Sequence, residues 1–174
     1  ILQIKIIIIA FLIGSSYLIG EQIYKTYTRR HKQLNDLIRV LEILRMDLSF
    51  GLYTLEEIFN RIGGNKEFCF WKFFYQISEG LHNEQSKTLE IIISENIDVL
   101  SKETYLGNKE IEELKNLILT LGKSDIESQQ RMIDLSIENL KKQTYETKED
   151  INKKGVLYKK LVTFIGIGIC IILI

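Results

Sequence analysis

The side chains that could do chemistry are few and lie far apart along the chain. His31 and His82 sit in polar surroundings, and neither has the nearby acid and nucleophile that histidine-based catalysis needs. Glu56-Glu57 and Glu112-Glu113 are adjacent pairs, which on a helix point about 100° apart and so cannot share a proton or a metal ion. Gly63-Gly64 lacks the lysine and hydroxyl of a phosphate-binding loop. We therefore predict no catalytic residue and no enzyme.

The cysteines and the net charge exclude two further classes of site. Cys69 lies in an aromatic run and Cys170 in an apolar tail, so a disulfide between them is not expected, and two thiols do not make a metal site. The formal net charge is zero, which gives no reason to expect nucleic-acid binding. The sequence predicts no metal and no cofactor, which leaves proteins and membrane lipid as the expected partners.

Acidic residues are concentrated in the segment from 79 to 113. This segment carries nine acids against three lysines, a net charge of minus six. One interpretation is a solvated acidic face, with the basic stretches elsewhere meeting anionic lipid. The other is a docking surface, because a patch of one sign speeds association with a complementary protein. The candidate interface residues are Glu103, Glu110, Glu112 and Glu113.

The elements that would carry these residues are all predicted to be helices. The chain has no proline and is rich in Leu, Ile, Glu and Lys, a composition that suits long uninterrupted helices. Apolar residues recur at helical spacing throughout. The expected fold class is all-α, an antiparallel six-helix bundle between two terminal transmembrane helices that continue its first and last helices. The inner helices are expected near residues 54–62, 66–79, 84–100 and 108–121.

The last helix is predicted to run from Ser124 to the end of the sequence. Ser124 and Glu127 form a capping-box pattern, and Leu121-Gly122 before them is a helix stop. Gln130 falls on the apolar stripe of this helix, where a buried amide needs a partner. It is expected either to bond a neighbouring helix end or to reach solvent. The structural motif here is Leu121, Gly122, Asp125, Gln129 and Gln130.

Both ends of the sequence are apolar enough to cross a membrane. Residues 1–20 contain one charge, Lys5, and match the roughly 30 Å hydrocarbon core, which favours a retained anchor over a cleaved signal peptide. Residues 156–174 form the second predicted span, and residues 21–155 the domain between them. Basic residues flank both spans on the side of this domain, which the positive-inside rule places in the cytoplasm. They include Arg29, Arg30, Lys153, Lys154, Lys159 and Lys160.

Several of these segments together resemble the stage III sporulation protein AB family. The resemblance is carried by residues 27–34, by the helix ending at Phe50-Gly51, and above all by Leu121-Gly122 followed by Asp125 and Gln129-Gln130, which fits a family signature LGxxDxxxQ. It covers almost the whole chain. One departure is the turn after the first helix, where the proline of the family's Tyr-Gly-x-Thr-Pro-Leu pattern is missing.

The resemblance implies a place and a function. The central domain would be similar to the six-helix cytoplasmic domains of type II secretion and type IV pilus platform proteins. The protein would sit in the mother-cell membrane of a Gram-positive endospore former, as a non-enzymatic component of a secretion-like complex that links mother cell and forespore. It would contact other proteins of that complex, including a secretion-type ATPase. Two alternatives stay open: a two-anchor sensor with an external ligand-binding bundle, and a coiled-coil scaffold, with homo-oligomers possible in each case.

Overall fold

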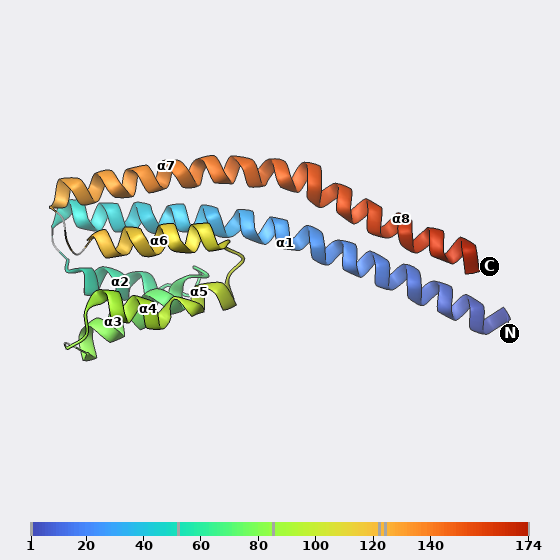
Figure 1. Cartoon of the computed structure of the whole chain (residues 1–174), viewed down its shortest axis with the longest axis horizontal. Helices are drawn as coiled ribbons and strands as arrows, with labels where there is room; N and C mark the ends of the chain where they lie inside the picture. The colour runs from blue at the N-terminus through green and yellow to red at the C-terminus, as the bar shows by residue number, and fades with distance from the viewer. Residues whose placement is uncertain (1, 52, 85, 122, 124, 174) are drawn as a thin grey trace. The chain divides into compact units, whose positions relative to one another are not determined.

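Every regular element in the described part of the chain is helical. The computed structural model describes residues 2–51, 53–84, 86–121, 123 and 125–173. Because only Ile97 separates α4 from α5, and α7, a π-helix and α8 follow one another directly, the described elements form six helical segments. The predicted all-α, six-helix fold is confirmed. In chain order the elements are α1 (Leu2–Phe50), α2 (Leu55–Gly64), α3 (Trp71–Asn83), α4 (Leu89–Asn96), α5 (Asp98–Glu103), α6 (Asn108–Leu121), α7 (Ile126–Asp150), the π-helix Ile151–Gly155 and α8 (Val156–Leu173) (Figure 1).

The chain divides into two compact units. Residues 32–144 form the first, called here the bundle, and residues 1–31 with 145–174 form the second, called here the hairpin. The long helices α1 and α7 contribute residues to both units.

The core of the bundle is built on the aromatic run that precedes and opens α3. Phe59, Phe70, Phe73 and Phe74 are fully buried. The ring of Phe74 lies 5.6 Å from that of Phe59 and 5.4 Å from that of Phe73, both in tilted or edge-on geometry that favours aromatic pairs. An apolar stripe of α1, whose residues recur at helical spacing, packs on this core with Leu34, Leu37, Ile38, Leu41, Leu44 and Leu48 buried.

Local signals fix the two ends of α2. Thr54 and Glu57 form a capping box, with the backbone N–H of Thr54 donating to Glu57 Oε2 at 2.7 Å. Near the other end, Gly63 lies against α3, since a Cβ there would come within 2.5 Å of the backbone nitrogen of Tyr75. Gly64 faces open space. Only a glycine at 63 therefore lets α2 and α3 approach this closely.

The turn that lacks the family's proline keeps the glycine of the pattern. Gly51 follows α1 with φ of 60°, a left-handed conformation that glycine adopts without steric cost. Its N–H donates to the carbonyl of Leu48 at 3.1 Å, which ends the helix.

In the hairpin, the first part of α1 lies along α8 (Figure 1). Small residues allow the close contact: Gly166 lies against the hydroxyl of Ser16, and a Cβ at Gly20 would come within 3.1 Å of the carbonyl oxygen of Lys159. The helix pair α1 and α7–α8 contains the two segments long and apolar enough to cross a membrane. Beyond the apolar ends, His31 Nδ1 of α1 lies 2.9 Å from Thr147 Oγ1 of α7, so the two helices also touch through polar side chains.

Candidate membrane and partner interfaces

The predicted motif at Leu121 to Gln130 joins three helices. Asp125 precedes the first residue of α7, and its Oδ1 accepts the N–H of Ser128 at 3.0 Å while its Oδ2 accepts the hydroxyl of Ser128 at 2.7 Å. The hydroxyl bond, and then the N–H bond, lower the pKa of the Asp125 carboxyl below its ordinary value. Asp125 is thus the N-cap in the described contacts. Gly122 and Ser124, with the capping box expected at Ser124, lie outside the described residues.

The two glutamines of the motif have different surroundings. The Gln129 side chain is buried, and its amide donates to the carbonyl of Leu121 at the end of α6. Gln130 is partly exposed and donates to the hydroxyl of Ser49 in α1 at 3.0 Å. The buried amide that needs a helix-end partner is therefore Gln129 rather than Gln130. Together the motif residues tie the start of α7 to α6 and to α1.

One residue of the predicted docking surface is in the wrong place for that role. Glu110 is only 4% exposed, and it lies close to Gly107, where a Cβ would collide with its carboxylate. The spacing explains this: Leu114, Leu117 and Leu121 follow at helical intervals and are all buried, so Glu110 continues the inward face of α6. The expectation that Glu110 belongs to an exposed interface is wrong.

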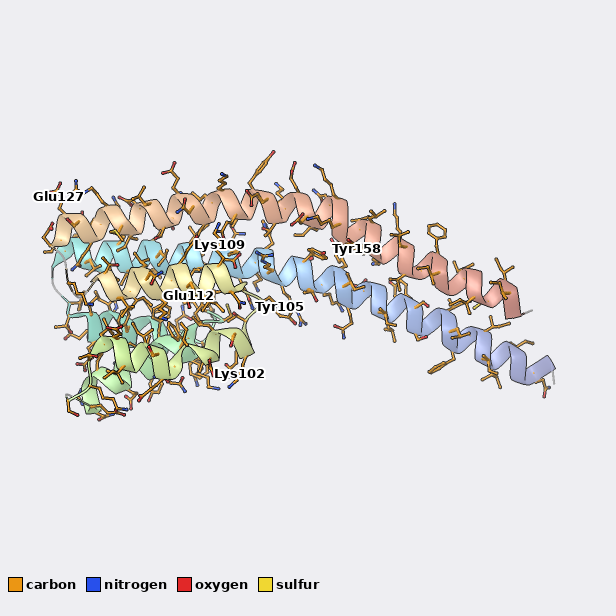
Figure 2. The ribbon with its side chains drawn as sticks, viewed as in Figure 1. Lys102, Tyr105, Lys109, Glu112, Glu127 and Tyr158 are labelled. Atoms are coloured by element: carbon orange, nitrogen blue, oxygen red, sulfur yellow. The ribbon has the colours of Figure 1, made fainter. Side chains whose placement is uncertain are left out.

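The other three acids lie nearer the surface, each with a polar partner. Glu103 pairs with Lys72 of α3, Glu112 lies 3.8 Å from Lys115, and Glu113 accepts the Gln143 amide at 3.3 Å. Figure 2 labels Glu112 on α6 together with Lys102 and Lys109, which come from the same α5–α6 part of the chain. The exposed face of this part is therefore mixed in charge, and Glu103 and Glu112 are its exposed acids among the predicted residues.

Three of the six membrane-proximal basic residues, Lys153, Lys154 and Lys159, are engaged with acids. Lys153 lies 3.5 Å from Glu149 and Lys154 lies 2.8 Å from Asp150, both one helical turn away. The Asp150 contact raises the pKa of Lys154. Arg29 and Arg30 lie in the same unit, exposed and half-buried respectively, each with a polar or ring contact.

Lys159 and Lys160 are neighbours that behave differently. The ammonium of Lys159 lies 2.6 Å from the carboxylate of Glu21 in α1 and within cation–π distance of the rings of Tyr17 and Tyr24. Lys160 is exposed and forms no ion pair with any described residue. Tyr158, labelled in Figure 2, is exposed beside them in the first turns of α8. Sequence periodicity does not reveal the Glu21–Lys159 pair, because its partners come from opposite ends of the chain.

One pocket of the bundle is too small to hold a ligand. The pocket between α1, α6 and α7, lined by Leu41, Glu110 and Leu114 among others, has a volume of about 10 Å³, enough for one water molecule. Among the described residues no cluster of three His, Cys, Asp or Glu side chains is placed to hold a metal ion. Burial, assisted by the Asp36 carboxylate, raises the pKa of the Cys69 thiol to about 12, so this thiol is protonated at neutral pH.

Comparisons with known proteins agree on one family. The family model described as "Stage III sporulation protein AB" matches residues 5–174. A solved structure entitled "Stage III sporulation protein AB (SpoIIIAB)" has the same fold, with a TM-score of 0.62 and 22% sequence identity, over 71% of this chain and 96% of that chain. A search of curated proteins finds no match. Since the family model covers nearly all of the sequence, the chain belongs to the stage III sporulation protein AB family.

Proposed function

We propose that this sporulation protein is a non-enzymatic platform in the mother-cell membrane. It would belong to a secretion-like complex that links mother cell and forespore, with residues 21–155 in the mother-cell cytoplasm. The observation that carries the proposal is the combination, in one member of this family, of a closed helical bundle with a separate helical hairpin whose ends are apolar enough to cross a bilayer. Such a chain can hold a protein-binding domain at a membrane surface.

The charges support the orientation. Lys25, Arg29 and Lys32 follow the first apolar segment, and Lys153 and Lys154 precede the second. Clusters of Lys and Arg beside a span favour the cytoplasmic side. The rings of Tyr17 and Tyr24 lie 5.5 and 5.4 Å from the Lys159 ammonium, and Tyr158 precedes Lys159 in α8. Tyrosines are enriched at membrane–water boundaries.

Docking of the secretion-type ATPase is assigned to the exposed acids of α5 and α6. Glu103 and Glu112 remain as candidates, whereas Glu110 is excluded by its burial. An exposed carboxylate can steer and orient a basic partner surface. The ion pairs of Glu103 with Lys72 and of Glu112 with Lys115 are exposed, and such pairs are weak enough in water to be exchanged for contacts with that partner.

Topology is the first test. A single cysteine at Asn83, exposed at the end of α3, is introduced in a background with Cys69→Ser and Cys170→Ser. Intact protoplasts of the mother cell are treated with a membrane-impermeant maleimide. Labelling only after permeabilisation is the expected result. Labelling of intact protoplasts would place the bundle outside and would favour an external sensor.

Partner binding is the second test. The double change Glu103→Lys and Glu112→Lys is compared with Glu138→Lys, an exposed acid on α7 with no described ion pair. The double variant is expected to lose co-purification with the ATPase by at least about ten-fold, the effect of like charges brought together at an interface. Circular dichroism checks that both variants stay helical. Equal binding by wild type and the double variant would refute this docking surface.

A further inference from the structure

The hairpin contains an open groove between α1 and α8. Its volume is about 620 Å³, and its wall includes Tyr17 and Tyr24 from α1 and Val156, Lys160, Phe164 and Ile167 from α8. The α8 residues recur at intervals of three or four, so they form one face of that helix. From Lys160 to Ile167 this face is about 10 Å long, which lies within the hydrocarbon depth of one leaflet, about 15 Å.

The groove has one polar end and an apolar remainder. Beyond Lys160, residues 161–172 carry no charge, and Phe164 is 68% exposed. The hydroxyl of Thr163, which also lines the groove, already donates to the carbonyl of Lys159 at 2.9 Å. The groove therefore offers apolar contact along its length and charge at one end only.

The polar end of the groove carries a net positive charge. Lys159 is held by Glu21 at 2.6 Å, and Glu21 also lies 4.0 Å from Lys25. The Lys160 ammonium has no acidic partner among the described residues. Counting Glu21 against Lys25, Lys159 and Lys160, the groove end keeps a net positive charge. A lysine can extend its ammonium toward the headgroups while its stem stays among apolar groups.

We propose that this groove binds one anionic phospholipid. Its phosphate lies at the ammonium of Lys160, and one acyl chain runs along Phe164 and Ile167 between the two helices. Charge complementarity selects this occupant, because a basic pocket between membrane helices suits an anionic headgroup, and the apolar face beyond Lys160 fits within one leaflet. The proposal rests on the membrane-spanning part of the proposed function, and it is independent of the ATPase contact.

The test uses the full chain in nanodiscs made from equal amounts of phosphatidylglycerol and phosphatidylethanolamine. Native mass spectrometry of the released protein counts the lipids that remain bound. The wild type is expected to retain one phosphatidylglycerol, enriched about three- to ten-fold over the bulk ratio. Lys160→Gln is expected to return the ratio to that of the bulk. Lys148→Gln, which removes an exposed charge elsewhere in the hairpin, should leave the enrichment unchanged.

A second pair of variants tests the groove itself. Ile167→Trp fills the apolar wall and should abolish retention although Lys160 is intact, whereas Ile165→Trp, at an exposed position outside the lining, should not. The proposal would be overturned if wild type retained the two lipids in their bulk ratio. It would also be overturned if Lys160→Gln and Lys148→Gln lost the phosphatidylglycerol enrichment equally. So would retention of a second protein chain in place of lipid. Failure of the chain to resist carbonate extraction would instead refute the membrane placement, which separates the two claims.

Discussion

The ammonium of Lys159 lies 2.6 Å from a carboxylate oxygen of Glu21, although 138 positions separate the two residues in the sequence. The same ammonium lies 5.5 and 5.4 Å from the ring centres of Tyr17 and Tyr24. The Lys159 backbone also forms the surface against which Gly20 packs. Lys159 of α8 thus contacts two successive turns of α1. These turns lie where the apolar part of α1 gives way to its polar part.

Charge reversal at either member of this pair should open the hairpin. Because two like charges would then face each other, Glu21→Lys and Lys159→Glu are each expected to reduce disulfide formation between Ile9→Cys and the native Cys170 about two- to five-fold. Cys170 is the natural probe, since its Sγ lies 3.8 Å from the Ile9 carbonyl oxygen. Oxidative cross-linking in a Cys69→Ser background measures the effect. The double reversal should restore the yield, and no recovery would contradict a direct pair.

Gly63 should be irreplaceable where Gly64 is not. Gly63→Ala places a methyl group within 2.5 Å of the Tyr75 backbone, and backbone cannot move aside as a flexible side chain can. We expect a loss of roughly 1–3 kcal/mol in the free energy of unfolding. Gly64→Ala meets open space and should be neutral or stabilising by up to about 1 kcal/mol. Denaturant titration followed by fluorescence of Trp71, the single tryptophan, reports on the bundle. Equal stabilities would refute the close approach.

Helical periodicity predicted the elements because their cores are built from local repeats. The α1 stripe and the aromatic centre of α3 are both buried as expected. The same periodicity indicates that Glu110 lies on the buried face of α6, since Leu114, Leu117 and Leu121 follow it by four, seven and eleven positions.

Other features of the site have no local pattern. The Glu21–Lys159 pair and the groove beside it combine residues of α1 and α8, so they form only when these two helices pack together. Helical spacing assigned Gln130 to the apolar stripe of α7, but Gln129, four positions before the buried Ile133, is the buried amide. The neighbouring helix end decides it, because the Leu121 carbonyl has no further helical turn to bond.

Gln129 should contribute more to stability than Gln130. Gln129→Met keeps the side-chain volume but leaves the Leu121 carbonyl without its described donor, at a cost of roughly 1–3 kcal/mol. Gln130→Met removes a bond to a surface hydroxyl that water can replace, and the loss should stay below about 1 kcal/mol. Trp71 fluorescence during denaturation compares the two variants with wild type. A larger loss at Gln130 would reverse the assignment.

The Asp125 cap should make stability depend on pH in the acid range. The Ser128 hydroxyl and N–H lower the pKa of the folded-state carboxyl below the ordinary value of 3.8. The folded protein therefore binds this proton less readily than the unfolded chain does. The contribution is complete above the unfolded pKa and is lost as pH falls through the lowered folded pKa.

Asp125→Asn isolates this effect, because the amide oxygen still accepts the Ser128 N–H bond but the side chain has no proton to gain. The Tm of wild type is expected to fall faster than that of Asp125→Asn as pH is lowered below about 4, with the curves parallel above pH 5. Ser128→Ala should shift the wild-type fall to higher pH, since it removes the largest cause of the lowered pKa. The Glu57 cap, whose pKa Thr54 also lowers, contributes equally to all three proteins and cancels in the comparison. Identical pH profiles for wild type and Asp125→Asn would show that this carboxylate does not cap α7 in solution.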